Sequence, residues 1–346
     1  MTDIDLWLIL SLCKVSFKKI KDKIDDKSFL NFFANELLNK NKTNLVEKIR
    51  KTFSFAEKNN IKLITYTSKD YPENLRHLSD PPILLYSKGD TSLLRSEKII
   101  SIVGSRRATS YGKSQASEFS KQLTSFGFII LSGLARGIDE FAHRSCLEVG
   151  GKTIAVLGNG LDVFYPQENR ELQIEISENG LLLSEYPFQE SPTVYSFPQR
   201  NRIIAALSRG TLVIEAEKKS GALLTANLCA DLGKDVFSLP GPVSSPKSFG
   251  TNTLIRNGAI LVRTFEDILE EFGYKIEKEK YITDQLDILT SQEERILSFL
   301  SSSEFIPFEL ISAKIEDIAV QDLLLVLTEL TLKNKIVERG GSYKIL

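Results

Sequence analysis

The apolar residues between positions 99 and 262 occur in short, unbroken runs separated by stretches of helical periodicity. The runs are rich in Ile, Val and Leu and lack the alternation of apolar and polar residues that marks a strand with one face in water. They predict seven strands: Ile99–Val103, Phe128–Leu131, Thr153–Leu157, Leu181–Leu183, Thr211–Ile214, Asp235–Leu239 and Ala259–Val262. The helices expected among them cover roughly 112–126, 137–149, 168–178, 198–207, 220–232 and 265–272. This pattern predicts an α/β fold, an extended Rossmann-like, doubly wound and mostly parallel sheet that binds ligands beyond the carboxyl ends of its strands.

The segments on either side of this sheet have different patterns. Residues 1–60 have apolar residues at helical spacing and predict a small helical domain. The turn Asp80-Pro81-Pro82 leads into the sheet, so the Rossmann-like domain is expected over 61–273. Residues 274–285 are polar and predict a linker. Within 286–346, three helical segments precede two short strands, which predicts a winged-helix-like domain.

The net charge of −1 hides an uneven distribution along the chain. Residues 1–62 carry 13 Lys and Arg against 8 Asp and Glu, whereas residues 264–346 carry 9 against 17. The near-neutral middle can hold a local basic groove, but the acidic end is expected to bind a protein rather than DNA. The lysine-rich stretch 14–27 leaves two interpretations open, a solvated helical face and an auxiliary nucleic-acid contact.

Cysteine and histidine usage favours a reduced compartment without a metal site. The three cysteines are far apart and form no CxxC pair, and the two histidines lack the partners that zinc needs. The N-terminus has no signal-peptide pattern, and no apolar run reaches the length of a membrane span. We expect a soluble, cytoplasmic protein with no metal and no membrane partner.

Glycines and short polar residues follow six of the predicted strands. The first strand ends in Gly104-Ser105-Arg106-Arg107, and the others lead into segments that begin at Ser132, Gly158, Ser184, Glu215 and Pro240. Because the carboxyl ends of parallel strands meet at one edge of a sheet, these segments predict one polar rim. A glycine turn, a helix start and guanidinium groups together are suited to holding phosphate.

No nucleotide-cofactor fingerprint fits this rim. Gly104-Ser105-Arg106 lacks the second glycine of GxGxxG, and Gly133 and Gly137 have the wrong spacing. Gly151-Lys152-Thr153 is similar to the end of a phosphate-binding loop, but a strand follows it where a helix is needed. We therefore expect no cofactor.

A catalytic centre is not indicated either. Asp139, His143 and Cys146 fall on one predicted helix, a set conceivable for nucleophilic catalysis. Side chains on one helix lie side by side rather than converging, so packing is the favoured interpretation. A nucleotide-binding or nucleotide-hydrolysing Rossmann-like enzyme stays open as the alternative, with Asp162 and Glu185 as its carboxylates.

The densest group of donors is Y-S-F-P-Q-R-N-R, which begins at Tyr195. An aromatic ring beside arginines is the usual device for binding single-stranded nucleic acid, because the ring stacks a base and the cations hold the backbone. Arg200 and Arg202 are two residues apart on a helix, so one can face the rim while the other braces the fold. The competing interpretation places Phe197 in the core and the arginines in salt bridges.

Taken in order, these motifs resemble the DNA-processing protein A family (DprA, also called Smf). The similarity covers about residues 61–263 and includes I-V-G-S-R-R from Ile102, S-G-L-A-R-G-I-D from Ser132, F-P-Q-R-N-R from Phe197 and E-A-E-K-K-S-G-A from Glu215. It implies a non-enzymatic protein that binds and protects incoming single-stranded DNA and dimerises through its Rossmann-like domain. It also implies that the protein loads a RecA-type recombinase during natural transformation and DNA recombination.

The same resemblance assigns site residues. Gly104, Ser105 and Arg106 would hold phosphates, and Phe197 would stack a base. Arg170 keeps the positive charge where many members have lysine, whereas Ala222 lacks the hydroxyl of the serine that the family often has there. The expected single-stranded-DNA site consists of Gly104, Ser105, Arg106, Arg107, Ser132, Gly133, Arg170, Phe197, Arg200, Asn201, Arg202, Lys219, Ser220 and Gly221.

Overall fold

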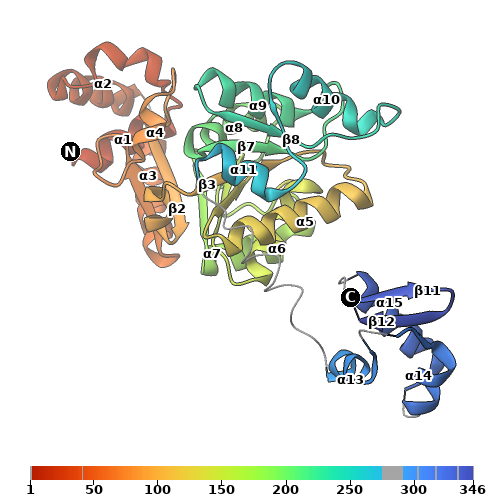
Figure 1. Cartoon of the computed structure of the whole chain (residues 1–346). Helices are drawn as coiled ribbons and strands as arrows, with labels where there is room; N and C mark the ends of the chain where they lie inside the picture. Colours follow the sequence, from red (N-terminus) through yellow and green to blue (C-terminus); the bar gives the residue numbers. More distant parts are fainter. Residues whose placement is uncertain are drawn as a thin grey trace. The chain divides into compact units, whose positions relative to one another are not determined.

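The computed structural model describes residues 2–40, 42–274, 291–301, 304–315, 318–332 and 335–345. The chain divides into two compact units, Met1–Phe272 and Gly273–Leu346, and each is described by itself (Figure 1). Apart from residue 274, the linker expected over 274–285 lies outside the described residues, as do the first residues of the domain expected from 286.

The first unit is built on a sheet whose described strands follow the order β1-β2-β6-β5-β4-β3-β7-β8-β9. These strands are β1 (Ile61–Thr65), β2 (Leu84–Gly89), β3 (Ile99–Val103), β4 (Ile129–Ser132), β5 (Thr153–Leu157), β6 (Leu181–Ser184), β7 (Gly210–Val213), β8 (Asp235–Ser238) and β9 (Ile260–Leu261). Within the described part of this sheet, neighbours from β6 through β9 are parallel, and the antiparallel pairs are those of β2 with β1 and with β6. The doubly wound, mostly parallel sheet is confirmed.

Helices cover both faces of this sheet (Figure 1). On one face lie α5 (Ser110–Ser125), α6 (Ile138–Glu148) and α7 (Arg170–Asn179); on the other, α8 (Ser196–Leu207) packs against α9 (Gly221–Asp231) and the short α4 (Glu73–Arg76). Next to β8 lies α10 (Phe249–Arg256), and α11 (Phe265–Glu271) contacts α5. No predicted helix corresponds to α10, because its glycine and threonines have low helix propensity.

The N-terminal helices are α1 (Asp3–Leu12), α2 (Lys27–Lys40) and α3 (Lys42–Lys58). A capping box starts α1, since the Thr2 hydroxyl accepts from the Asp5 N–H and the Asp5 carboxylate accepts from the Thr2 N–H. Trp7 is fully buried and donates its indole N–H to the Thr67 hydroxyl at 2.9 Å. Helices α1 and α3 pack on β1, so they belong to the same compact unit as the sheet, and the domain boundary expected at residue 60 stays a prediction.

The second unit contains α13 (Ser291–Phe299), α14 (Phe308–Lys314), α15 (Val320–Leu332) and a small sheet in the order β10-β12-β11. The strands β10 (Ile306–Pro307), β12 (Ser342–Ile345) and β11 (Ile336–Arg339) pair antiparallel. Buried Ile296, Ile311, Leu323 and Leu327 form the centre of its core. The order of helices and strands follows the expected one, and the winged-helix assignment stays a prediction.

The strand order changes direction at β3. From β3 the chain builds β4, β5 and β6 on one side; after α8 it returns to place β7, β8 and β9 on the other. The buried hydroxyls of Ser101 on β3 and Thr211 on β7 lie 2.7 Å apart and join the two strands. In open α/β sheets the crevice beyond the carboxyl ends at such a switch point is where ligands bind.

Within the described part of the chain, none of the helices has both the length and the apolar character needed to cross a bilayer. The same residues contain no group of three or more His, Cys, Asp or Glu side chains placed to hold a metal ion.

Candidate nucleic-acid interface

A cavity of about 590 Å³ opens at the carboxyl ends of β3 and β7, at the switch point of the sheet. Its walls come from the loop after β3, the first turns of α8 and α9, and the loop after β8. Its lining includes five basic residues, Arg106, Arg107, Arg200, Lys219 and Lys247, and two acidic residues, Asp139 and Glu217. The excess of cations makes the cavity attractive to anions.

The loop after β3 is held by close packing and by one buried carboxylate. A Cβ atom at Gly104 would lie 2.5 Å from the Ile138 side chain, so only glycine allows the loop to approach α6 this closely. Buried Glu215 accepts from the backbone N–H and the hydroxyl of Thr109. Thr109 in turn caps α5 by accepting from the Gly112 N–H at 3.1 Å. These contacts fix the base of the loop and leave its tip facing the cavity.

The tip of this loop has one buried hydroxyl and two exposed cations. The Ser105 hydroxyl accepts from the Arg107 N–H at 3.2 Å and from the Lys247 ammonium at 3.1 Å. Lys247 also pairs with Glu217 at 2.5 Å, so this lysine ties the loop after β8 to the loop after β3. Arg106 and Arg107 are exposed, and their guanidinium groups can meet an incoming phosphate.

Phe197, in the first turn of α8, is the aromatic centre of the cavity. The Arg106 guanidinium lies over its ring, 4.6 Å from the centroid, and the Tyr165 ring lies 5.6 Å away, tilted by 33°. An exposed cation–π contact contributes about 0.5–1 kcal/mol, whereas stacking of a base on an aromatic ring contributes about 1–3 kcal/mol. A base can therefore displace the guanidinium from Phe197 with a net gain.

Arg200 lies beneath the cavity and is almost fully buried. Its guanidinium donates to the carbonyl oxygens of Gly133, at 2.7 Å, and of Val156, and to the Asn201 side chain. Burial lowers the pKa of Arg200 to about 10, opposed by the nearby Asp139 carboxylate, so the group stays charged at neutral pH. A Cβ atom at Gly133 would lie 2.3 Å from this guanidinium, which explains the glycine.

The buried Asp139 carboxyl lies near the Arg200 guanidinium and interacts with its charge. Burial raises the pKa of its carboxyl, and the Arg200 charge and hydrogen bonds from the Ala135 and Gly133 N–H groups oppose that rise. His143 and Cys146 do not join it: burial lowers the pKa of His143 to about 3 and raises that of Cys146 to about 11. Neither side chain lines the cavity, so the conceivable nucleophilic set is not assembled.

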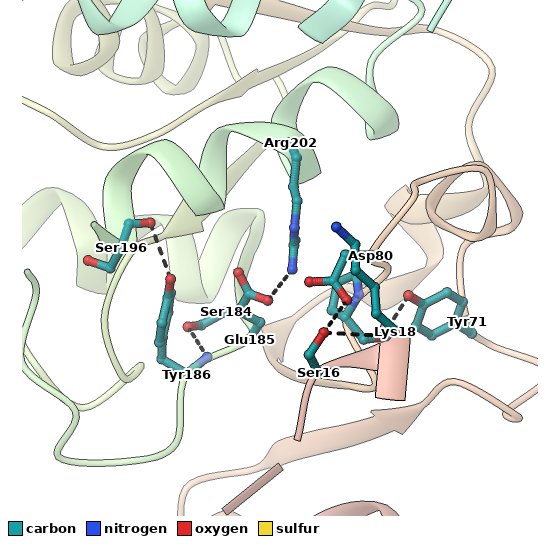
Figure 2. Close-up of polar contacts among 10 residues, drawn as sticks. Ser16, Lys18, Tyr71, Asp80, Ser184, Glu185, Tyr186, Ser196 and Arg202 are labelled. Atoms are coloured by element: carbon teal, nitrogen blue, oxygen red, sulfur yellow. Dashed lines mark hydrogen bonds and ion pairs between the residues drawn. The ribbon is translucent and has the colours of Figure 1, made fainter. Parts of the chain in front are cut away.

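Arg202 does not line the cavity; Figure 2 shows its side chain extending from α8 toward Glu185. It pairs with Glu185 at 2.5 Å, and both side chains are nearly buried. Around them a separate cleft of about 180 Å³ is lined by Ser16, Asp80 and the strand end that carries Glu185. Burial raises the pKa of Glu185, and the Arg202 charge opposes that rise. Arg202 therefore braces the fold between α8 and β6.

Three other expected site residues also lie outside the cavity lining. Ser132 is buried and donates to the Ile102 carbonyl at 2.6 Å, and Gly133 serves Arg200 through its backbone. Arg170 is exposed, and its guanidinium lies over the Phe164 ring. The expected residues that do line the cavity are Gly104, Ser105, Arg106, Arg107, Phe197, Arg200, Asn201, Lys219, Ser220 and Gly221.

The polar rim is less continuous than expected. The segment after β6, with Glu185, lines the separate cleft, and Pro240-Gly241-Pro242 after β8 does not line the cavity. Asp162 is away from it too, since its carboxylate accepts from the Gln189 N–H. The two carboxylates of the alternative enzyme hypothesis therefore lie outside the cavity.

Sequence reasoning missed three kinds of residue here. Lys247 reaches Ser105 across 142 positions, a contact that only the folded sheet creates. Glu215 and Asp139 act from beneath the surface, and nothing in their local sequence marks that role. Tyr165 lies in the glycine-containing segment that follows the strand Thr153–Leu157, so the strand-end pattern could have identified it as a cavity residue.

Residues 62–273 match the model of the family described as DNA recombination-mediator protein A. The chain is 37% identical over 305 residues to Protein Smf of Escherichia coli K12, covering 86% of this chain and 80% of that protein. It is 45% identical over 204 residues to DNA processing protein DprA of Streptococcus pneumoniae R6, covering 59% of this chain and 72% of that protein.

Two solved structures are similar to this fold. DNA processing protein A from Streptococcus pneumoniae matches with a TM-score of 0.60 at 39% identity, covering 67% of this chain and 82% of that chain. DNA processing protein A from Helicobacter pylori, solved to explain its single-stranded DNA binding mode, matches with a TM-score of 0.56 at 34% identity. That match covers 62% of this chain and 98% of the other.

Proposed function

This chain belongs to the DNA recombination-mediator protein A family, and we propose that it is a non-enzymatic, cytoplasmic protein that binds and protects single-stranded DNA. The observation that carries the proposal is the cavity at the switch point, which is lined by the Phe197 ring and by five basic residues, with Arg106 directly over the ring. The protein would act in DNA processing during natural transformation and recombination, the role that the family resemblance implies.

Phosphates of the strand would meet Arg106 and Arg107 on one wall and Lys219 on the other. Lys219 stands just before α9, whose cap Ser220 accepts from the Ala222 N–H at 3.3 Å. A helix N-terminus presents backbone N–H groups and a partial positive charge, which favour phosphate. The side-chain cations and the start of α9 thus support binding of the backbone.

Phe197 supports a preference for single strands. A base can lie on the ring only if one of its faces is free, and in a duplex both faces are stacked. Unstacking a paired base costs a few kcal/mol, which is comparable to the whole gain from one aromatic contact. Duplex DNA would therefore bind through its phosphates alone and more weakly.

The non-enzymatic part of the proposal has support in the placement of the carboxylates. Asp162 and Glu185 are held outside the cavity, and Asp139, which is buried in its wall, has one carboxylate oxygen that accepts from two backbone N–H groups. We also propose dimerisation through the Rossmann-like unit and loading of a RecA-type recombinase, both carried over from the family resemblance.

The direct test replaces Arg106 with alanine and measures single-stranded DNA binding over a salt series. We expect affinity to fall about tenfold or more, since a hydrogen bond to a charged group contributes about 1.5–3 kcal/mol. The slope of log K against log salt should become shallower by about 0.7, the value for one phosphate contact on a single strand.

The matched control is Arg95→Ala. Arg95 is exposed and pairs with Asp70 just before β3, at the opposite end of that strand from the cavity. This variant should bind like the parent at every salt concentration. If Arg106→Ala does so as well, the cavity is not the DNA site.

A further inference from the structure

A second, shallower hollow of about 420 Å³ adjoins the cavity. It is lined by Glu217, Lys218, Val243, Ser244, Ser245, Pro246 and Phe249, and Glu217 lines both hollows. We call it the Phe249 hollow. Its walls are the segment before α9 and the loop between β8 and α10. The sequence analysis marked the start of this loop, at Pro240, but none of the loop residues that line the hollow.

The Phe249 hollow exposes apolar surface. Val243 is 98% exposed and Phe249 is 50% exposed, although both are large apolar side chains. Apolar groups that gather in a hollow on an otherwise polar surface commonly mark a binding site. Phe249 is the first residue of α10, so its position is set by a regular element rather than by the loop alone.

The hollow repeats the chemistry of the main cavity. The Lys218 ammonium lies 5.7 Å from the Phe249 ring centroid, as the Arg106 guanidinium lies 4.6 Å from that of Phe197. An accessible ring beside a cation is suited to a base and its phosphate, because every base has a face that can stack. The same pair of groups thus occurs in two adjoining hollows.

Lys247 forms the ridge between the two hollows. Its ammonium donates to Ser105 in the cavity and pairs with Glu217, which both hollows share. Lys218 and Lys219 stand on the same stretch of chain as Glu217, whose carboxylate is paired with Lys247, so two exposed cations remain beside this ion pair. A phosphate backbone that crosses from one hollow to the other therefore passes Lys218 and Lys219.

We propose that the Phe249 hollow is a second subsite for the same DNA strand, in which a base farther along the strand than the one on Phe197 stacks on Phe249 while Lys218 contacts the connecting backbone. The inference rests on the proposed function. The continuity of the hollows and the cationic ridge favour a nucleic-acid strand over an apolar protein segment, which would leave these lysines without acceptors.

The test compares oligothymidines of about 4 and about 16 nucleotides, lengths that bracket one and several contacts. Phe249→Ala should weaken binding of the longer strand at least about fivefold, the lower end of one base–aromatic stack. Binding of the short strand, which the main cavity holds, should not change. Phe249→Trp should retain the affinity of the parent, because it keeps a stacking surface.

Matched controls come from the second unit, where Lys344 lies 5.4 Å from the ring centroid of the partly exposed Phe305. Phe305→Ala removes an equivalent ring and should leave binding of both strands unchanged. Lys218→Ala removes an exposed charge without touching the fold. It should weaken the longer strand and make its salt dependence shallower by about 0.7.

The outcomes separate the two proposals. If the parent binds neither strand, the proposed function fails. If the parent binds both strands and Arg106→Ala weakens both, while Phe249→Ala and Lys218→Ala match the parent on the longer strand, only the second subsite is overturned. It is also overturned if Phe249→Ala changes the oligomeric state and not the affinity per monomer, because the hollow is then an interface between copies.

Discussion

Helix α8 carries two arginines two residues apart, and their surroundings differ in kind. Arg200 donates to backbone carbonyl oxygens beneath the cavity, whereas Arg202 pairs with the Glu185 carboxylate toward β6. Carbonyl oxygens satisfy a guanidinium without cancelling its charge, while a carboxylate in contact neutralises it. Arg200 is offset only by the nearby Asp139 carboxyl, whose pKa is raised, so it adds more positive potential to the cavity than Arg202 does. The same residue type therefore serves binding on the side of α8 that carries Arg200, the cavity side, and bracing on the side that carries Arg202, the bracing side.

The bracing side has further contacts, which Figure 2 shows. The Tyr186 hydroxyl donates to the Ser196 carbonyl at 3.2 Å in the first turn of α8, and the Ser16 hydroxyl donates to Asp80 at 3.0 Å. The first bond connects α8 to the segment after β6, and the second connects the N-terminal segment to the loop before β2.

The largest effect should come from breaking the ion pair of the bracing side. Arg202→Ala leaves Glu185 buried without its cation, and we expect the free energy of unfolding to fall by about 3–5 kcal/mol. Urea denaturation measures this loss. Replacing both residues, as Arg202→Met with Glu185→Leu, should recover most of it. A loss below about 1 kcal/mol in Arg202→Ala would show that the pair behaves like an exposed one.

An intermediate effect is expected on the cavity side. Arg200→Met leaves the carbonyl oxygens of Gly133 and Val156 without a donor and should lower the free energy of unfolding by about 1–3 kcal/mol. It also removes the charge that opposes the raised pKa of Asp139. The affinity for single-stranded DNA should also fall in Arg200→Met. In Arg202→Ala the apparent affinity should fall only in proportion to the fraction of protein that is unfolded.

The pH dependence of Arg200→Met distinguishes the two arginines further. A buried carboxyl with a raised pKa loses stability as pH rises from its unfolded value, about 3.9, through its folded value. Without Arg200 the folded pKa of Asp139 rises further, so the loss continues to higher pH. The difference in unfolding free energy between Arg200→Met and the parent should therefore grow as pH rises above the folded pKa that Asp139 has in the parent. Adding Asp139→Asn should abolish that growth, and a difference that stays constant with pH would contradict the coupling.

The smallest effect should come from Tyr186→Phe. The variant deletes one hydrogen bond of the bracing side, and the free energy of unfolding should fall by about 0.5–1.5 kcal/mol. DNA affinity should stay at the parent value, because Tyr186 does not line the cavity. Fluorescence titration with an oligonucleotide checks this. A large loss of affinity with little loss of stability would show that the two sides of α8 are not separate.

Much of the fold could be predicted, because each parallel strand is an unbroken run of apolar residues in the sequence. All seven predicted runs match strands β3 to β9 to within two residues at each end. The antiparallel pairing of β2 with β1 and β6 could not be predicted, since no local pattern encodes which strand becomes a neighbour. Nor could α10, whose residues form a helix only because Gly250 and Thr251 are buried against the body of the unit.

The site was predictable where a motif leads directly from a strand into a helix, as at Gly104–Arg107 and at Ser220. It was not predictable where the direction of a side chain decides whether the residue lines the cavity. Ser132 ends a strand at the correct edge, but it points into the sheet and donates to the Ile102 carbonyl. Lys247 could not be predicted as a cavity residue, because its contact with Ser105 joins loops that are far apart in sequence.

The central position of β3 has a consequence for synthesis on the ribosome. Its neighbour β4 follows soon after it, but its other neighbour, β7, is made only at residues 210–213. Until then β3 is an apolar edge strand with unpaired backbone groups, the kind of edge that recruits strands from other chains. The cavity opens at the carboxyl ends of β3 and β7 and is completed only when Lys247 has been added. A nascent or truncated chain thus lacks the cavity for as long as it exposes this edge.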